Sequence, residues 1–588
     1  MVKRLYYRFS RSTTTYFLLI AAIVGFLSGV GNFLLVTFTK AAHFFFFNFV
    51  GNRIFHIDRG GVYGIFIVFI PVLGSIALIP IYQVLKGITG GYAFPRFIAE
   101  VHLKMGDVDF RRFFSALFAS SICIGSGGSA GREGPIAVIG GVIGSFLSKR
   151  LNLKGKRRQI LVGCGVAGGI AATFNAPITG VLFAEEIVFM GEMKLNTFSL
   201  FVISSVASTT FTRVFLGQES IFKPPPYLFE SIYQLPLYGL LGIFVGMFAA
   251  FYKKSFFAIE DYFEAAKVNW RVKLIIGALM VGVMGFFMPE VLSDGYNVIH
   301  EIIYFSQSRF TVIFLFFLLI LKIFATDITL GSGGSGGLFA PSLFIGAVLG
   351  AFFGSIYHAM FPHLLIEPGA YAVVAMGAFL AASTHAPLTA IFLLLELTSN
   401  YQVILPIMLA SIIGTIVSMA FEQESLDTRF FKKNKIPLEY AKEVSFLKST
   451  KSSEIMQKDF VTVNRSMTLG QLVELIKESP YMSFPVVDEN NKVVGMITLN
   501  DIRSFMFEEG IWQLVIVDDV KQDNFYFLKI DDDLSEAQEL FDFYDLEEIP
   551  VVDNDMKIAG IITRHDFVTF ARKRFLMEHS HESPISDL

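Results

Sequence analysis

Cysteine, tryptophan and charged side chains are scarce in this chain of 588 residues. Its two cysteines, Cys123 and Cys164, lie in apolar stretches and are too few for a disulfide framework, so we expect buried free thiols. Charged residues make up only 17% of the chain, whereas 53% of the residues are hydrophobic. This balance excludes an ordinary soluble globular protein and predicts an integral membrane protein. The formal net charge of −3 argues against a nucleic-acid partner.

Long apolar runs are present in the first 421 residues. Since a helix of about 20 apolar residues spans a bilayer, these runs predict a multi-pass protein embedded in lipid. Two shorter runs, 136–147 and 342–353, each follow a glycine-rich phrase and predict broken helices of the kind that line transporter cavities. The candidate spans are 16–38, 64–85, 239–252, 274–288, 310–324 and 404–421.

The start of the chain is basic and lacks a cleavage site of small residues before the first apolar run. We therefore expect an uncleaved first span with the amino terminus in the cytoplasm. The expected location is the cell inner (plasma) membrane. The basic residues are Lys3, Arg4, Arg8 and Arg11.

Hydrophobicity falls sharply after residue 421, where a soluble tail begins. Within the tail, Phe484–Asp501 returns as Ile549–Asp566, and each copy reads as strand, turn, strand and helix. The expected fold class is an all-α polytopic membrane domain followed by a cytoplasmic α+β tandem. The expected boundaries are 1–421 for the membrane domain, 422–451 for a linker, 452–511 and 512–575 for the tandem and 576–588 for a terminal tail.

The membrane domain is repeated as well. The phrase Gly125–Pro135 returns as Gly331–Pro341, and Ala176–Glu186 is matched by Ala386–Glu396. Four landmarks in the same order predict two halves, which we expect to be inverted repeats with a site at their interface. The halves are about 14–216 and 235–421.

Each glycine phrase is a candidate anion site. Consecutive glycines allow main-chain N–H groups to turn toward a ligand, and the closing proline suits the first turn of the following helix. Because the free N–H groups of a helix start carry partial positive charge, the two phrases predict a shared anion path. A nucleotide-binding P-loop is the weaker interpretation, because neither phrase ends in Gly-Lys-Ser/Thr.

These motifs carry a resemblance to a known family. The Gly-Arg-Glu-Gly-Pro and Gly-Gly-Leu-Phe-Ala-Pro endings and the repeated tail are similar to the CLC chloride channels and proton-coupled chloride exchangers with tandem CBS domains. The resemblance implies transport of chloride or a related anion, with or without protons, by a homodimer with one pathway in each subunit. It implies no enzymatic activity and no required cofactor. It also implies a gate at Glu133 and an anion held by main-chain N–H groups of Gly134, Leu338 and Phe339.

Glu133 suits a gate on physical grounds as well. A carboxylate beside a group of N–H donors can occupy the anion position itself, and protonation would release it because the neutral acid is attracted less. The alternative is a glutamate that only caps its helix. The neighbouring Arg132 either adds positive potential to the anion site or forms a structural ion pair.

The chain departs from the family pattern near the anion. Tyr92 stands where a serine usually donates to the anion, and it either supplies a hydroxyl in that serine's place or packs as an aromatic residue. Asp427 stands where a tyrosine usually faces the anion. Because a carboxylate would repel the anion, we expect Asp427 to turn away or to be paired.

A third departure concerns the proton route. Many exchangers carry a second glutamate directly after a structural one, and with Glu186 as the structural glutamate this position is Ile187, which argues against strict proton coupling. The repeat partner Glu396 supports this register and is expected to be structural too. In the alternative register, Glu185 is structural and Glu186 carries protons. Asp327, also in an apolar stretch, has no assigned role.

The tail repeats each place a threonine and an aspartate three residues apart at a strand-to-helix turn. CBS tandems resemble binding modules for adenine nucleotides, in which such a pair can hold phosphate and ribose hydroxyls. The alternative is a purely structural or dimerising tail, in which the aspartate caps the helix. The candidate residues are Thr498, Asp501, Thr563 and Asp566.

Three rival functions stand beside anion exchange. A passive chloride or anion channel would move no protons uphill. A CBS-regulated cation (Mg²⁺) transporter would need convergent carboxylate or carbonyl oxygens, whereas the glycine phrases present N–H groups. A membrane-anchored nucleotide sensor without transport would leave the repeated glycine phrases unexplained.

Overall fold

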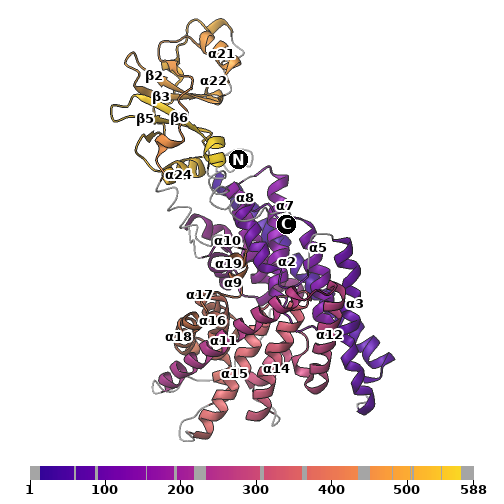
Figure 1. Ribbon diagram of the computed structural model, residues 1–588. Helices are drawn as coiled ribbons and strands as arrows, with labels where there is room; N and C mark the ends of the chain where they lie inside the picture. Colours follow the sequence, from indigo (N-terminus) through magenta and orange to yellow (C-terminus); the bar gives the residue numbers. More distant parts are fainter. Residues whose placement is uncertain are drawn as a thin grey trace. The chain divides into compact units, whose positions relative to one another are not determined.

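The chain folds into two compact units in a computed structural model, residues 1–436 (unit 1) and 437–588 (unit 2) (Figure 1). Unit 1 is built of helices, and unit 2 contains two small three-stranded sheets with helices. The all-α first domain and the α+β tandem expected from the sequence are confirmed. The structure describes residues 13–57, 61–85, 90–153, 155–190, 195–217, 234–304, 310–360, 367–434, 450–479, 481–503, 505, 509–544 and 546–570.

The first half of unit 1 packs its helices through small residues. A Cβ on Gly25 would lie 2.1 Å from the Ser204 carbonyl oxygen, and one on Gly140 would lie 2.0 Å from the Gly165 carbonyl oxygen. Such backbone contact suits helices in lipid, where apolar side chains gain little by associating. The elements are α2 (Thr13–His43), η1 (Phe44–Ile54), η3 (Gly61–Val68), α3 (Phe69–Val84), α4 (Phe94–Leu103), α5 (Arg111–Phe114), η4 (Ser115–Ala119), α6 (Ser120–Gly125), α7 (Glu133–Arg150), α8 (Gly155–Phe174), α9 (Pro177–Phe183), η5 (Ala184–Val188) and α10 (Leu195–Leu216).

The second half uses the same kind of packing. A Cβ on Gly350 of α15 would lie 2.2 Å from the Tyr371 carbonyl oxygen of α16, so these helices touch through their backbones as α7 and α8 do. The elements are α11 (Leu235–Ala265), α12 (Trp270–Phe287), η7 (Pro289–Val291), α13 (Tyr296–Tyr304), α14 (Val312–Gly331), α15 (Phe339–Met360), α16 (Pro368–Thr384), α17 (Pro387–Thr398), η8 (Tyr401–Val403), α18 (Ile404–Phe421) and α19 (Arg429–Lys433).

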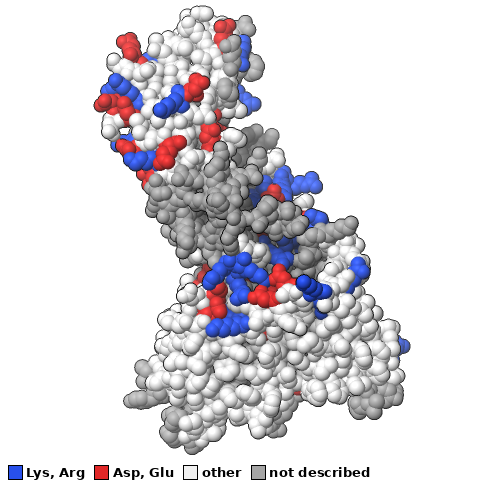
Figure 2. All heavy atoms as spheres, viewed as in Figure 1, with Lys and Arg blue, Asp and Glu red and all other residues white. Residues whose placement is uncertain are grey.

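Eight helices within the described residues are long and apolar enough to cross a membrane. On α12, large apolar side chains such as Ile276, Val283 and Phe287 are exposed. Figure 2 shows one face of unit 1 on which uncharged side chains form a broad band while charged ones gather at one end. Such a surface suits lipid contact. The eight segments are Tyr16–Ile54, Gly64–Val84, Thr197–Leu216, Leu235–Ala265, Trp270–Phe287, Val312–Gly331, Phe339–Met360 and Tyr401–Phe421.

The span Thr197–Leu216 was not among those expected from the sequence. Its serines and threonines lower its mean hydropathy to 1.4, which is why its apolar character is weak. Ser204 on this helix is fully buried, and its hydroxyl donates to the Cys164 carbonyl oxygen of α8 at 2.5 Å. Hydroxyls that bond to neighbouring helix carbonyls do not prevent a helix from spanning a membrane.

Helices α7 and α15 are longer than the broken helices expected from the runs 136–147 and 342–353. They have 18 and 22 residues. Residues beyond the apolar runs continue both helices, 148–150 in α7 and 354–360 in α15. Both still begin directly after the glycine phrases, which is the feature that matters for the site.

Two glutamates tie the repeated halves together. Glu186 accepts hydrogen bonds at 2.7–3.1 Å from the N–H groups of Leu388 and Thr389 and from the Thr389 hydroxyl, at the start of α17. Glu396 on α17 accepts the equivalent three at the start of α9, including the N–H and the hydroxyl of Thr179 at 2.8 and 2.6 Å. This reciprocal capping confirms that Glu186 and Glu396 are structural groups.

The segment after α18 packs into unit 1. Leu426 and Phe431 are buried, and the N–H of Leu426 donates to the Ser383 carbonyl oxygen at 3.1 Å. The segment expected as a linker, 422–451, therefore begins inside the first unit, and the division between the units falls at residue 436. As a result, Asp427 belongs to the helical unit.

Unit 2 contains two copies of one small fold. In each copy the first strand pairs in parallel with the second, and the second pairs in antiparallel with the third. The amphipathic helices α21 and α24 add Leu472 and Phe541 to the two hydrophobic cores. The elements are η9 (Ser452–Glu454), β1 (Val463–Asn464), α21 (Leu469–Glu478), β2 (Ser483–Val487), β3 (Val493–Thr498), α22 (Leu499–Ile502), η10 (Glu509–Ile511), α23 (Val517–Val520), β4 (Leu528–Lys529), α24 (Leu534–Tyr544), β5 (Glu548–Val552) and β6 (Ile558–Thr563).

Candidate functional site

The two glycine phrases lie side by side in unit 1. Gly131 and Gly337 exchange both main-chain hydrogen bonds, at 2.7 and 2.8 Å. Gly91, which precedes α4, donates to the Gly334 carbonyl oxygen at 2.7 Å. The starts of α4, α7 and α15 are therefore tied to one another through the backbone. This is the arrangement that a shared anion path requires.

Glycine is needed where the phrases touch. A Cβ on Gly337 would lie 2.7 Å from the Gly134 nitrogen, and a Cβ on Gly131 would lie 2.1 Å from Oε2 of Glu133. Real Cβ atoms do not approach other atoms so closely. A larger residue would therefore separate α7 from α15 or displace the Glu133 carboxylate.

A narrow cavity lies where these helix starts converge. Part of its wall is aromatic, since the Phe339 ring centre lies 5.6 Å from that of Phe174 and 5.8 Å from that of Phe183. Apolar walls strengthen the attraction between an anion and the helix starts. The lining consists of Tyr92, Phe94, Glu133, Gly134, Phe183, Leu338, Phe339, Thr384 and Asp427, which includes five of the six anion-site candidates taken from the sequence.

The Glu133 side chain is fully buried, and both oxygens of its carboxylate are bound. Oε2 accepts the N–H of Ala340 at 3.2 Å, one of the free donors at the start of α15. Oε1 accepts the Tyr296 hydroxyl at 2.6 Å. The carboxylate thus lies on a helix N-terminus, where an anion would also be stabilised. Sequence reasoning missed Tyr296 and Ala340, because they are 163 and 207 positions away and no local pattern relates them to Glu133.

Arg132 forms an ion pair beside Glu133. Its Nε lies 3.3 Å from Oδ2 of Asp294, and its guanidinium lies 5.4 Å from the centre of the Tyr296 ring. Arg132 is not among the residues that line the cavity. The ion pair, one of the two interpretations of Arg132, is present, and the guanidinium also lies over the Tyr296 ring whose hydroxyl binds Glu133.

A buried lysine supports this segment. Lys322 of α14 is fully buried, and its ammonium donates to the carbonyl oxygens of Val291 and Ser293, both at 2.9 Å. The next residues along the chain are Asp294 and, two further on, Tyr296. Lys322 therefore positions the segment that holds Arg132 and Glu133, and the signal that could have found it is its charge within the apolar run 310–324.

Tyr92 and Asp427 are paired. The Tyr92 hydroxyl donates to the Asp427 carboxylate, which is only 4% exposed, so the expectation that Asp427 is paired is confirmed. The Tyr92 ring lies edge-on against Phe256, with ring centres 6.1 Å apart. Burial raises the pKa of the Asp427 carboxyl, which lies beyond the last spanning helix, to about 6, although the bond from Tyr92 lowers it.

The carboxylates near the expected proton route have other contacts. Glu186 caps α17 and is therefore the structural glutamate. The position directly after it, where many exchangers carry a second glutamate, is Ile187, which is buried and cannot ionise. Glu185 accepts the Thr197 hydroxyl at 3.2 Å. Asp327, fully buried in α14, accepts the Ser255 hydroxyl at 2.5 Å. These contacts therefore do not favour the alternative register, in which Glu185 is structural and Glu186 is a free proton carrier.

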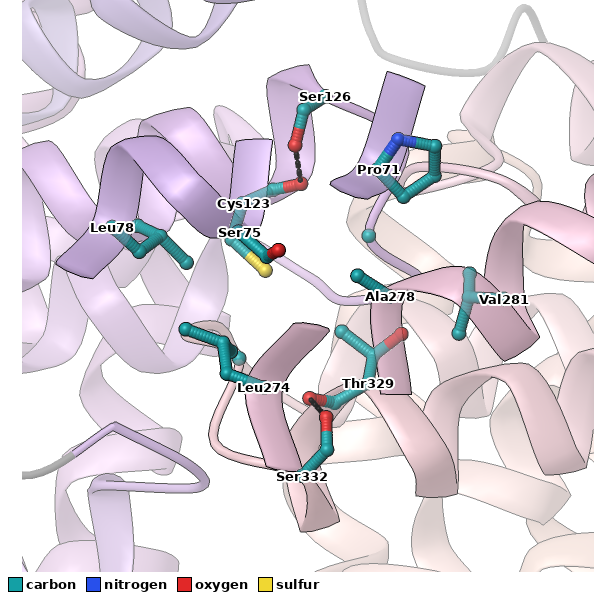
Figure 3. A pocket seen from close by; sticks show the side chains of 12 residues that line it. Pro71, Ser75, Leu78, Cys123, Ser126, Leu274, Ala278, Val281, Thr329 and Ser332 are labelled. Atoms are coloured by element: carbon teal, nitrogen blue, oxygen red, sulfur yellow. Dashed lines mark hydrogen bonds between the residues drawn. The ribbon is translucent and has the colours of Figure 1, made fainter. Parts of the chain in front are cut away.

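A second small cavity lies between α3, α6, α12 and α14 (Figure 3). Its three serine hydroxyls donate to helix carbonyl oxygens, Ser75 to Val72 at 2.7 Å, Ser126 to Cys123 at 3.1 Å and Ser332 to Thr329 at 3.3 Å. Its lining is otherwise mostly apolar, so it offers an anion little. Cys123 and Cys164 are buried free thiols, as expected.

The candidate nucleotide residues of unit 2 take part in helix caps. Oδ2 of Asp501 accepts the N–H and the hydroxyl of Thr498, both at 2.8 Å, and its Oδ1 accepts the side-chain amide of Gln522 at 2.8 Å. In the second copy, Oδ2 of Asp566 accepts the Thr563 hydroxyl at 2.5 Å. The same oxygen accepts the Gln457 side-chain amide at 2.8 Å. A glutamine amide of each copy thus donates to an aspartate of the other copy, Gln522 to Asp501 and Gln457 to Asp566.

Comparison with known proteins agrees with the sequence and the fold. Residues 73–419 match the family described as voltage gated chloride channel, and residues 453–508 and 517–573 match the CBS domain. The chain is 36% identical over 322 residues to a putative chloride channel protein ClcB-like of Ralstonia nicotianae, covering 54% of this chain and 74% of that protein. It is 32% identical over 420 residues to the H(+)/Cl(-) exchange transporter ClcA of Vibrio campbellii, covering 69% and 87%.

Solved structures share the fold. A slow cyanobacterial Cl-/H+ antiporter superposes with a TM-score of 0.65 at 24% identity, over 71% of this chain and 97% of that one. A eukaryotic CLC transporter superposes with a TM-score of 0.61 at 19% identity, over 94% and 99%. With eight apolar helices of spanning length among its described residues, unit 1 is a multi-pass membrane domain. The chain is therefore a member of the CLC family, the voltage gated chloride channel family, with two CBS domains behind its membrane domain.

Proposed function

We propose that this protein transports chloride or a related anion across the membrane through the cavity at the starts of α4, α7 and α15, with Glu133 as the gate. The observation that supports it most is the bond from the N–H of Ala340 to the Glu133 carboxylate. A dehydrated chloride and this carboxylate would compete for the same partial positive charge. Protonation removes the carboxylate's advantage, so one residue links a proton to an anion.

In this proposal the anion is bound by main-chain donors of Gly134, Leu338 and Phe339. All three residues line the cavity, and the last two stand at the start of α15. Main-chain N–H groups do not ionise, so this part of the site holds an anion at any pH. Arg132, paired with Asp294, contributes by fixing Tyr296.

Proton movement distinguishes two candidate functions. The relatives include H(+)/Cl(-) exchange transporters, which favours exchange. Ile187 after the structural glutamate favours the second candidate function, passive anion flux, because isoleucine cannot relay a proton. The cation transporter and the sensor without transport are not favoured, because the membrane domain matches an anion-transport family.

A liposome experiment tests the proposal. Purified full-length protein is reconstituted, a chloride gradient is imposed, and chloride efflux and external pH are followed together. We expect chloride efflux above that of empty liposomes. Uphill proton movement selects exchange, and chloride flux without it selects the passive path. If no chloride moves at any pH, the proposal fails.

We also propose that the protein is a homodimer with one pathway in each subunit, in the cell inner (plasma) membrane, with the amino terminus and the CBS domains in the cytoplasm. The family membership and the basic start of the chain support this arrangement. Light scattering of the purified protein tests the dimer, and protease access to the tail in intact inside-out vesicles tests the orientation.

For the CBS tandem we propose adenine-nucleotide binding at the Thr498–Asp501 and Thr563–Asp566 turns. Titrating ATP into the purified full-length protein should release heat. Asp501→Ala or Asp566→Ala should weaken ATP binding about tenfold or more, because a charged hydrogen-bond acceptor for the ribose is lost. Asp531→Ala, an exposed partner of Lys451, is the control and should bind as the wild type does. Without heat from ATP, ADP or AMP, the tandem is purely structural.

A further inference from the structure

The Tyr92–Asp427 pair places a second ionisable group in the proposed pathway. Both residues line the same cavity as Glu133, but they come from different segments, Tyr92 ahead of α4 and Asp427 after α18. Glu133 is already bound by Tyr296 and Ala340, so Asp427 does not share its contacts. The cavity therefore has two carboxyl groups, of which the gate uses one.

The position of Asp427 is fixed by a tight turn. The Ser425 hydroxyl oxygen accepts the N–H groups of Asp427 and Thr428, both at 3.2 Å, and the Thr428 hydroxyl oxygen accepts the N–H of Ser425 at 2.9 Å. The neighbouring Leu426 is tied to the Ser383 carbonyl oxygen. Because the backbone is held in this way, the Asp427 carboxylate cannot easily turn out of the cavity.

The charged groups around this turn have contacts of their own. Lys253 contacts the ring of His385 at 2.9 Å and donates to the Glu422 carbonyl oxygen at 2.8 Å. Arg429 bonds to Asp261 at 2.6 Å, Lys432 to Glu424 at 2.9 Å, and Arg132 to Asp294 at 3.3 Å. Across the cavity stands Glu133, and the hydroxyl partner of Asp427 is Tyr92. Within the described contacts, the ionised Asp427 is thus held by a neutral hydroxyl, so its charge opposes an anion in the cavity.

The hydroxyl of Tyr92 can serve only one acceptor at a time. A tyrosine hydroxyl has a single hydrogen and two acceptor lone pairs. While Asp427 is ionised, that hydrogen is bound to its carboxylate, and Tyr92 has none to offer an anion. If Asp427 takes a proton from water, its own O–H can donate to the Tyr92 oxygen. The Tyr92 hydrogen is then free to rotate toward the cavity while the ring stays against Phe256.

We propose that Asp427 is a second proton-binding site of the anion pathway, and that its protonation both removes a repelling charge and releases Tyr92 to donate to the anion. This inference rests on the proposed anion transport. It unites the two interpretations of Tyr92, since the residue packs as an aromatic residue in one protonation state and also acts as an anion donor in the other. By linkage, each anion bound would favour uptake of a proton at Asp427.

The test measures chloride binding by calorimetry on full-length protein in the Glu133→Gln background, which removes the proton of the gate. We expect the chloride Kd to weaken about tenfold or more between pH 5 and pH 8. Titrations in buffers of different ionisation enthalpy should show net proton uptake on binding near pH 6. Adding Asp427→Asn should remove both the pH dependence and the proton uptake, leaving tight binding at pH 8.

Further variants keep the test decisive. Adding Asp427→Ser should act like Asp427→Asn if the amide disturbs folding. Adding Tyr92→Phe should weaken binding at pH 5, where the freed hydroxyl matters. Glu424→Gln, in the same turn but bonded to Lys432 outside the cavity, should leave the pH dependence unchanged.

Two results would overturn the inference. One is unchanged pH dependence and proton uptake after Asp427→Asn and Asp427→Ser. The other is unchanged binding at pH 5 after Tyr92→Phe. Either would leave the proposed function intact, because chloride would still bind and move. Absence of chloride flux from the wild-type protein in liposomes would instead overturn the proposed function.

Discussion

Replacing Glu133 by glutamine should abolish chloride-driven proton transport and remove the steep dependence of chloride flux on the gate's protonation. The carboxylate holds the N–H of Ala340 and the hydroxyl of Tyr296, at 3.2 and 2.6 Å, and a neutral amide competes far less for the positive start of α15. The amide also neither takes up nor releases a proton near neutral pH. For an exchanging wild-type protein we expect proton transport to fall about 100-fold or more, to the background, and for either candidate function chloride flux continues. Reconstituted liposomes with chloride and pH electrodes measure both quantities.

Glu185→Gln is the matched control, because Glu185 is also buried but accepts a hydroxyl from Thr197 outside the cavity. It should keep the wild-type fluxes.

Gly131→Ala tests the binding of the Glu133 carboxylate at the start of α15 without removing that carboxylate, since the new Cβ would lie 2.1 Å from Oε2 of Glu133. It should raise chloride flux at neutral pH and keep some proton movement. Wild-type proton transport in Glu133→Gln would refute the gate.

Glu396→Ala should be strongly destabilising. Its carboxylate accepts three hydrogen bonds at 2.6–3.0 Å from the start of α9, and the alanine variant would leave these donors without a partner inside the helical unit. Each lost partner costs about 1–3 kcal/mol, so we expect the free energy of unfolding to fall by about 3 kcal/mol or more. Thermal unfolding of the purified protein, with size-exclusion chromatography, measures this loss.

A series of variants distinguishes the stability lost with the cap from an unspecific loss of stability. Thr179→Val removes one of the three bonds and should cost about 1 kcal/mol. Glu186→Ala, which removes the mirror-image cap at Thr389, should cost as much as Glu396→Ala. If Glu396→Ala unfolded at the wild-type temperature, the reciprocal caps would not hold the two halves together.

Much of the fold was predictable because its signals are local. Apolar runs predicted most spans, and the repeated phrases predicted where α7 and α15 begin. The equal offset of Glu186 and Glu396 from a proline predicted two equivalent structural groups, and the structure shows that each caps a helix of the other half. The failures were local as well: α10 was missed because its serines and threonines lower its hydropathy, although Ser204 among them bonds to a carbonyl oxygen of the neighbouring α8.

The site was predictable only in part. Glu133 and the glycines carry their chemistry in a short motif, so they could be recognised from the sequence. The partners of Glu133 could not, because Tyr296 lies 163 positions away on a helix whose pattern is only that of an apolar face. Likewise Tyr92 and Asp427 could each be flagged as unusual, but not as a pair 335 positions apart.

The sequence by itself determined that this protein is a repeated membrane protein of the CLC family with an ionisable residue at one of two glycine-rich helix starts. Those properties follow from composition, repeat order and short motifs. Only the tertiary structure decided which groups hold that residue, that Arg132 is bound to Asp294, and that the hydroxyl of Tyr92 is bound to Asp427. The physical reason is that hydrogen bonds and ion pairs depend on distances of a few ångströms, which the packing of distant helices sets and which no local pattern records.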